Sequence, residues 1–238
     1  MEVGIFVAPQ VGATYDDQLA AALQAEHHGF DAFVRSDHYM AAPGQTALPG
    51  PTDAWLSLAG LARDTSRIRL GTRAAPAGHS FDFDGTWYRL TACPALPKPV
   101  QAPHPPMVIG GRGLRRTPSI AARFADELNV SPAASPEQAR EMFVCATTAC
   151  EAIDRDPATL RRSVMVTTIC GENSHDVDRR LAGPGAGQPD ICGTPDEVVA
   201  QLRAFEQAGA SKAYLRLVDL HDLEHIALIG DRVLPFVR

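Results

Sequence analysis

The segment Ser36-Asp37-His38 carries the clearest candidate for acid–base chemistry in the chain. It follows the run Asp31–Arg35, whose apolar and β-branched residues predict a strand, so the histidine would stand just past the strand's carboxyl end. An imidazole exchanges a proton near neutral pH, and a neighbouring carboxylate sets its tautomer or raises its pKa. We therefore take Asp37 and His38 as candidate catalytic residues, the alternative being a histidine that caps a surface loop.

A second segment, Gly110-Gly111-Arg112-Gly113, predicts an anion-binding turn. Glycines allow backbone N–H groups to approach a phosphate closely, and the helix that follows adds the partial positive charge of its N-terminus. Arg115 and Arg116 bring further charge to the same turn, and we expect Thr117 to cap the helix with Pro118 in its first position. The spacing is neither a Walker loop nor a dinucleotide fingerprint, and a plain tight turn is the alternative.

Metal and disulfide chemistry have little support in the sequence. His221 and His225 have the spacing of helical zinc ligands, but Glu224 is misplaced for that motif, so a solvated helix start is the better interpretation. The five cysteines form no zinc-ribbon or C-x-x-C pattern, and we expect them to be reduced and mostly buried. They are Cys93, Cys145, Cys150, Cys170 and Cys192.

Strand-like runs alternate with amphipathic helical segments along the whole chain, which predicts an α/β fold with a parallel sheet. Periodicity alone allows a doubly wound sheet or a (β/α) barrel, but the first strand is not followed by a glycine-rich turn, and this favours the barrel. No linker divides residues 1–238, so we expect a single domain. The expected strands are Val3–Ala8, Asp31–Arg35, Ile68–Thr72, Met107–Ile109, Leu128–Val130, Val164–Ile169 and Ala213–Val218. The expected helices are Tyr15–His28, Asp53–Asp64, Pro118–Asp126, Pro136–Ile153, Pro195–Ala208 and Leu223–Leu234.

Residues 73–106 break this alternation, since they contain seven prolines and no helical pattern. Within them, Phe81–Leu90 alternates around Asp84-Gly85, which predicts a β-hairpin.

Charge and hydropathy exclude several classes of protein. The 28 acidic residues outnumber the 22 basic ones, which argues against a nucleic-acid-binding protein. No apolar run is long enough to span a membrane and the N-terminus does not resemble a signal peptide, so we expect a cytoplasmic protein without a membrane partner.

Several separated segments, in order, resemble the luciferase-like monooxygenase superfamily. They are Met1–Phe6, Gly29–His38, Arg67–Thr72 and the helix start at Gly110–Gly113. The later Gly193–Glu197 segment resembles the branch that depends on the deazaflavin coenzyme F420. The resemblance implies a TIM-type (β/α) barrel, a homodimer, and a flavin or deazaflavin held across the carboxyl mouth of the barrel.

By the same resemblance, Gly110, Gly111, Arg112 and Gly113 would receive the cofactor phosphate. Thr72, Ala74 and Ala75 would lie in the bulge that supports the ring system. Asp37 and His38 would match the pocket pair, with the histidine stabilising or protonating the group that gains or loses hydride.

The sequence departs from the family at one place. Relatives continue from the third strand into a helix–strand–helix unit before the hairpin, whereas here Ala75 is followed almost at once by Phe81. We therefore expect a barrel of about seven strands. A smaller barrel, a gap filled by a partner subunit, or an engineered or incomplete sequence would each account for the missing unit.

The function that this resemblance implies is hydride transfer between F420 and a small organic substrate. The alternatives are a non-catalytic flavin-binding protein with a truncated barrel, for which the missing unit argues, and an FMN-dependent monooxygenase.

Overall fold

The computed structural model describes residues 1–38, 52–71, 81–86, 89–93, 101, 104–131, 135–183 and 187–238. The strands are β1 (Glu2–Val7), β2 (Ala32–Arg35), β3 (Arg69–Gly71), β4 (Phe81–Asp84), β5 (Arg89–Cys93), β6 (Val108–Gly111), β7 (Glu127–Val130), β8 (Arg161–Cys170), β9 (Ile191–Gly193) and β10 (Lys212–Arg216). The helices are α1 (Tyr15–His27), α2 (Ala54–Asp64), α3 (Arg116–Phe124), α4 (Pro136–Glu151), α5 (Ser174–Leu181), α6 (Pro195–Gln207), α7 (Leu223–Arg232) and α8 (Leu234–Val237).

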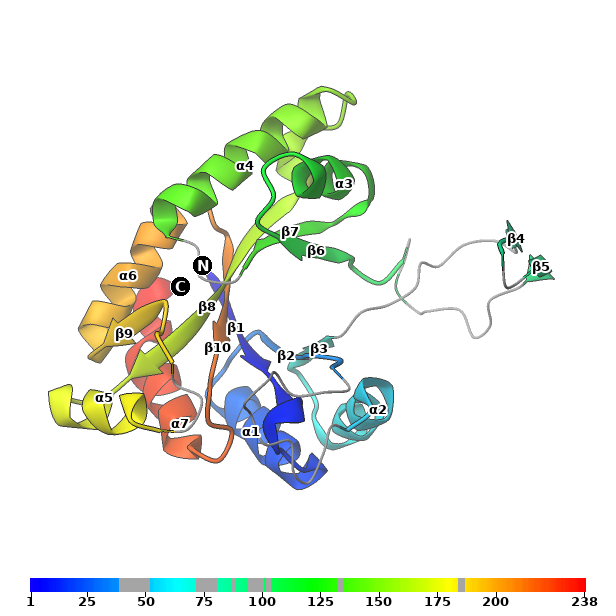
Figure 1. Cartoon of the computed structure of the whole chain (residues 1–238). Helices are drawn as coiled ribbons and strands as arrows, with labels where there is room; N and C mark the ends of the chain where they lie inside the picture. Colours follow the sequence, from blue (N-terminus) through cyan, green and yellow to red (C-terminus); the bar gives the residue numbers. More distant parts are fainter. Residues whose placement is uncertain are drawn as a thin grey trace.

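Seven of the described strands form one parallel sheet in the order β3-β2-β1-β10-β8-β7-β6, and β9 adds a short parallel pairing to β8. The sheet curls, and the helices lie on its outer side (Figure 1). This is an incomplete TIM-type barrel, and it confirms the predicted α/β barrel of about seven strands.

The barrel is open between β3 and β6. Each of these strands pairs on one side only within the described residues, β3 with β2 and β6 with β7. In a closed barrel of eight parallel strands one more strand would join them. The opening therefore falls where the sequence predicts the missing unit.

The predicted hairpin is confirmed. β4 and β5 form a separate antiparallel sheet, with Asp84 opposite Arg89.

Side-chain caps explain where most helices begin. Ser135 and Gln138 form a reciprocal capping box at the start of α4, with Pro136 in its first turn. The expected helix Pro195–Ala208 is α6, which begins at the expected residue, and the Thr194 N–H before it donates to Glu197 Oε2 over 2.8 Å. A Thr-Pro start is also expected for α3. That expectation is wrong, because α3 begins at Arg116 with Arg115 in the capping position, so that Thr117 lies inside the helix.

The hydrophobic core lies between the outer face of the sheet and the helices. Val3, Ile5 and Val7 of β1 are fully buried there, together with alanines of α1. Because strand side chains alternate, Gly4 and Phe6 point to the inner face. The outer face of the sheet is therefore apolar and buried under the helices, whereas the other set of alternating residues lies on the inner face.

Three elements were not predicted. The helix α5 has few apolar residues, the strand β9 is only three residues long, and the four-residue helix α8 begins where the expected helix Leu223–Leu234 ends, so none of them has a long apolar pattern. None of the helices in the described ranges is long and apolar enough to cross a membrane.

Candidate functional site

Both predicted chemical segments lie at the same edge of the sheet. All seven strands run parallel, so their carboxyl ends meet at one edge. Asp37 and His38 follow the end of β2, and Gly110–Gly113 spans the end of β6. β2 and β6 lie towards opposite ends of the strand order, so the two segments face the opening of the barrel from different sides.

Asp37 and His38 are both exposed. Among the described residues neither side chain has a hydrogen-bond partner, and the two are not paired with each other. The structure therefore brings the histidine to the expected edge but does not show the carboxylate orienting it.

Arg35, the last residue of β2, holds the backbone that leads into Asp37 and His38. Its guanidinium is 3% exposed and donates to the backbone oxygens of Ser36 (3.1 Å) and Thr52 (2.7 Å). It also donates to Gln18 Oε1 (3.1 Å) and Thr52 Oγ1 (2.9 Å). Burial lowers the pKa of this guanidinium, and Asp37 and Asp53 act in the opposite direction. Arg35 thus ties the end of β2 to the residues that precede α2.

The glycine segment after β6 leads directly into α3. The capping residue Arg115 makes no side-chain cap, in contrast to the capped α1, α2 and α4. The N–H groups of the first turn of α3 therefore lack the usual side-chain acceptor, and a bound anion would supply one.

The three glycines of this segment differ in what surrounds them. A Cβ on Gly111 would meet Thr117 Oγ1 at 2.9 Å, so the close approach of β6 to α3 requires glycine there. A Cβ on Gly110 would lie 3.6 Å from the Asn129 backbone oxygen, and one on Gly113 would lie 3.5 Å from Thr117 Oγ1. These are ordinary contacts, so the protein itself leaves space at Gly110 and Gly113.

Three arginines surround the start of α3. Arg112, Arg115 and Arg116 are all exposed, and none of them forms an ion pair or side-chain hydrogen bond within the described ranges. The uncapped turn, the free space at two glycines and the three cations fit a phosphate group. Thr72, Ala74 and Ala75, the predicted support of the ring system, lie outside the described residues.

Sequence analysis missed a polar network on the inner face. Lys212 Nζ lies 3.8 Å from Glu127 Oε2 and 3.9 Å from Glu2 Oε2, and Arg69 Nη2 lies 2.9 Å from the same Glu2 oxygen. Ser163 donates to Glu127 Oε1 over 2.5 Å. Burial lowers the pKa of Lys212, against the opposing effect of Glu127. The alternation Lys212-Ala-Tyr214-Leu-Arg216 was the available signal, because every second residue of this strand is polar.

His225 corrects a second expectation. Asp222 caps α7 as a helix start requires, but His225 is 3% exposed rather than solvated. Its Nε2 accepts the backbone N–H of Cys170 over 2.9 Å. Arg180 donates to the Cys170 backbone oxygen and pairs with Asp222. Burial, with Arg180 nearby, lowers the pKa of His225 to about 4. His225 therefore has a structural role between β8 and α7, and its partner in the predicted pair, His221, is exposed.

No group of three or more potential metal ligands occurs in the part of the chain that the structure describes. In the same part, Cys145, Cys150, Cys170 and Cys192 carry free thiols, of which Cys150 and Cys170 are buried. Burial raises the pKa of Cys170 to about 12, which makes it a poor nucleophile.

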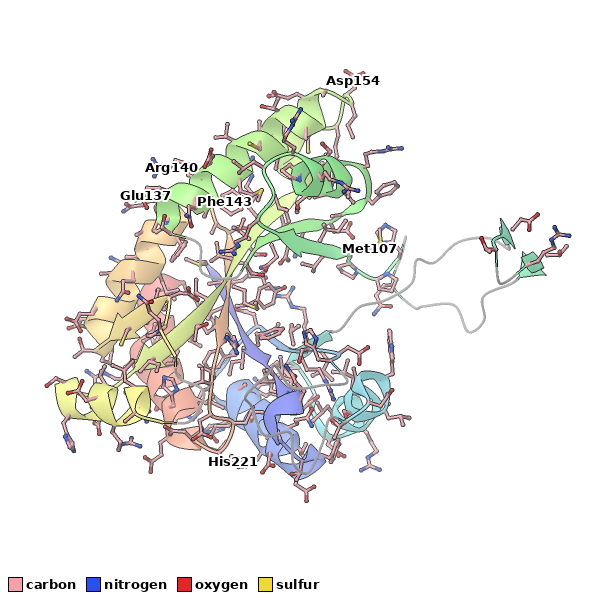
Figure 2. The ribbon with its side chains drawn as sticks, viewed as in Figure 1. Met107, Glu137, Arg140, Phe143, Asp154 and His221 are labelled. Carbon is pink, nitrogen blue, oxygen red and sulfur yellow. The ribbon has the colours of Figure 1, made fainter. Side chains whose placement is uncertain are left out.

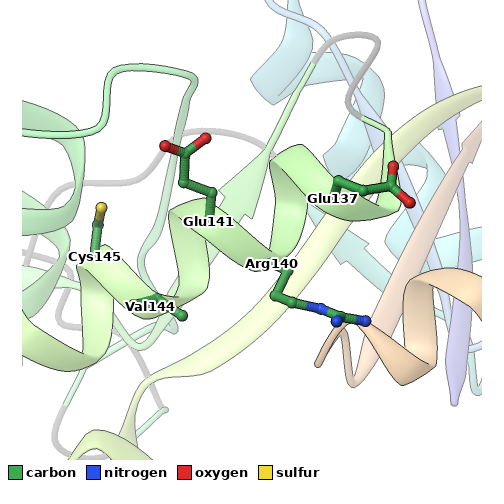
Figure 3. Close-up of a pocket in the computed structure, with 5 residues that line it drawn as sticks. All are labelled: Glu137, Arg140, Glu141, Val144 and Cys145. Atoms are coloured by element: carbon green, nitrogen blue, oxygen red, sulfur yellow. The ribbon is translucent and has the colours of Figure 1, made fainter.

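A shallow hollow of about 400 Å³ lies along α4, lined by Glu137, Arg140, Glu141, Val144 and Cys145 (Figure 3). Glu137 and Arg140 lie on the outer side of this helix, whereas Phe143 is buried beneath it (Figure 2). The hollow is therefore separate from the inner face of the sheet and brings none of the candidate residues together.

The family comparison matches the chain to a model described as luciferase-like monooxygenase, over residues 1–80 and 73–185. The two matches overlap at residues 73–80, the place where we expect a helix–strand–helix unit to be missing. None of the curated proteins matches the chain.

Solved structures with the same fold include enzymes of two cofactor types. An F420-dependent secondary alcohol dehydrogenase, solved with an F420-acetone adduct, is 15% identical with a TM-score of 0.78. An F420-dependent tetrahydromethanopterin reductase from Methanopyrus kandleri is 13% identical with a TM-score of 0.77. The FMN-bound oxygenating constituent of 3,6-diketocamphane monooxygenase from Pseudomonas putida is 14% identical with a TM-score of 0.76. Each comparison covers 100% of this chain and 99% of the other. At these identities the likeness shows the fold.

Proposed function

Because the chain belongs to the luciferase-like monooxygenase family, we propose that it is an oxidoreductase that binds a phosphate-bearing flavin or deazaflavin at the carboxyl edge of its curled sheet. The observation that supports this most is the start of α3. Three features occur together at the end of β6: an uncapped helix N-terminus, two glycines where a Cβ would make only ordinary contacts, and three arginines that form no ion pair within the described residues. These are the features that bind phosphate.

We take F420 as the first candidate cofactor and FMN as the second. The Gly193–Glu197 segment resembles the F420-dependent branch, and two of the structural neighbours are F420-dependent enzymes. The FMN-bound neighbour supports the alternative of an FMN-dependent monooxygenase. Thr72, Ala74 and Ala75 remain our proposed support for the ring system.

When bound, the cofactor would supply the hydride chemistry, and the chain would supply position and proton transfer. His38 would exchange a proton with the substrate group that gains or loses hydride, and Asp37 would orient or charge its imidazole. Arg35 would hold the backbone of this segment by the hydrogen bonds described above.

A second function is a flavin-binding protein without catalysis. Two observations on the described residues favour it: Asp37 and His38 are exposed without partners, and no described strand joins β3 to β6. A site that cannot exclude water or orient its acid–base group would still bind a cofactor.

The experiment that separates these functions is a titration of the purified protein with F420 and with FMN, followed by assays of the loaded protein on a panel of alcohols and carbonyl compounds. Binding of F420 with turnover supports the oxidoreductase. Binding without turnover of any compound supports the binding protein, and FMN binding with turnover that requires a reductase and oxygen supports the monooxygenase. Failure to bind either cofactor contradicts all three.

A further inference from the structure

The inner face of the sheet has a row of residues close to the carboxyl ends of its strands. The strand registers place Gly71 opposite Val34, Phe6 opposite Val34 and Arg216, and Arg216 opposite Thr167. In this row Arg216 alone is charged.

The position of Arg216 on the inner face follows from its neighbours in β10. Leu215 belongs to the apolar core under the helices. A Cβ on the inner-face residue Gly4 would meet Tyr214 Cδ1 at 3.2 Å, so Tyr214 points to the inner face. Arg216 stands two residues further along the strand and therefore shares that face.

Arg216 is half-buried and lacks an acidic partner. Within the described residues its guanidinium makes no ion pair and no hydrogen bond, and the Thr167 hydroxyl beside it makes no hydrogen bond either. Two other basic residues of the inner face do have acidic partners: Arg69 pairs with Glu2, and Lys212 lies near both Glu2 and Glu127. A half-buried guanidinium with no carboxylate partner in the described ranges can bind the carboxylate of a ligand, because its planar fork matches that group bidentately.

We infer that Arg216 receives the carboxylate of a small organic acid, with the Thr167 hydroxyl as a second donor, so that the substrate class is carboxylate-bearing alcohols or carbonyl compounds. This inference rests on the proposed function. Val34 and Arg216 are separated by one intervening strand, so their backbones lie about 10 Å apart. Asp37 and His38 follow Val34 by three and four residues. A small molecule anchored at Arg216 therefore extends towards the acid–base segment.

The test measures binding of butanoate and of its neutral, similarly shaped counterpart butanamide, to the protein with and without F420, by calorimetry. We expect butanoate to bind about 10- to 100-fold more tightly than butanamide, because a charge-assisted bidentate pair adds to the contacts that both probes share. Arg216→Gln should abolish this preference and Arg216→Lys should retain part of it. Arg140→Gln, which removes an exposed arginine from the outer side of α4, is the matched control and should keep the preference.

Equal binding of the two probes to the wild-type protein, or a preference that persists in Arg216→Gln, would overturn the inference. So would a loss of F420 affinity in Arg216→Gln as large as the loss of butanoate affinity, because Arg216 would then serve the cofactor. This result differs from a failure of the proposed function. If the proposed function is wrong, neither F420 nor FMN binds, whether or not the protein prefers butanoate.

Discussion

Gly111 and Gly113 are two residues apart, but a side chain would have a different effect at each position. A Cβ at Gly111 would lie too close to Thr117 Oγ1, at 2.9 Å, whereas a Cβ at Gly113 would make only an ordinary contact with the same atom, at 3.5 Å. The first glycine serves the packing of β6 against α3, and the second leaves room for a ligand.

Gly113→Val should therefore leave the fold intact and lower the affinity for the cofactor about 10-fold or more, because the side chain occupies the space that we assign to phosphate. Gly111→Ala is the contrasting variant, and it should lower stability through its contact with Thr117. Thermal unfolding and fluorescence titration measure the two effects. Unchanged cofactor affinity in Gly113→Val would remove this segment from the site.

His38 is the residue on which catalysis depends in the proposed enzyme. Its replacement by alanine should lower kcat by about two to four orders of magnitude on the best substrate from the panel, because a positioned acid–base group contributes that much. His221→Ala is the control, since His221 is exposed and belongs to neither candidate segment. A kcat for His38→Ala within twofold of the wild type would exclude His38 from the mechanism.

At the scale of elements, His225 joins β8 to α7 and makes that junction sensitive to acid. As the acceptor of the Cys170 N–H it must be neutral, and burial lowers its pKa from the ordinary 6.5 to about 4. Above pH 6.5 the histidine is neutral in both the folded and the unfolded chain, so it has no effect on the pH dependence. Between about pH 6.5 and pH 4 the unfolded chain takes up a proton that the folded chain does not. The free energy of unfolding therefore decreases as the pH is lowered through this range.

We expect this histidine to remove about 3 kcal/mol of stability over that interval. Chemical denaturation at several pH values measures the slope, which His225→Gln should reduce and which His175→Gln, at an exposed histidine without an ion pair in the described residues, should leave unchanged. Equal slopes in the wild type and His225→Gln would contradict the assignment.

The sequence predicted the apolar strand residues that pack under the helices better than the polar residues on the inner face of the sheet. Val3, Ile5 and Val7 mark β1 because they pack under helices, and each of the seven predicted strands has such residues. Lys212 and Glu127 were missed because a charge at a strand's first residue looks like a loop residue unless its partner across the sheet is known. Thr117 has the residue type of a cap, but α3 begins one residue earlier, at Arg116, and Thr117 packs inside the helix beside Gly111.

At the scale of the whole molecule, the opening between β3 and β6 leaves two strand edges without partners in the described structure. The homodimer that the family resemblance implies stays a prediction. Hydrogen exchange tests whether a second copy covers these edges. For an uncovered opening, amides of β3 and β6 should exchange faster than those of β1 and β10, which are paired on both sides. Equal protection of the edge and central strands would show that the edges are covered, and light scattering would then give the number of copies.

Paired titrations, with and without the cofactor phosphate, show whether the start of α3 binds the phosphate of a flavin-type cofactor. FMN and riboflavin share one ring system and differ only in the phosphate. F420 differs from its phosphate-free deazaflavin chromophore in the phosphate and in the acidic tail attached to it, so the FMN pair isolates the phosphate. We predict that the phosphate-bearing member of at least one pair binds about 10- to 100-fold more tightly to the wild-type protein, and that Gly113→Val removes this difference. Equal affinity for both members of each pair, or no binding of any of the four, would contradict the account.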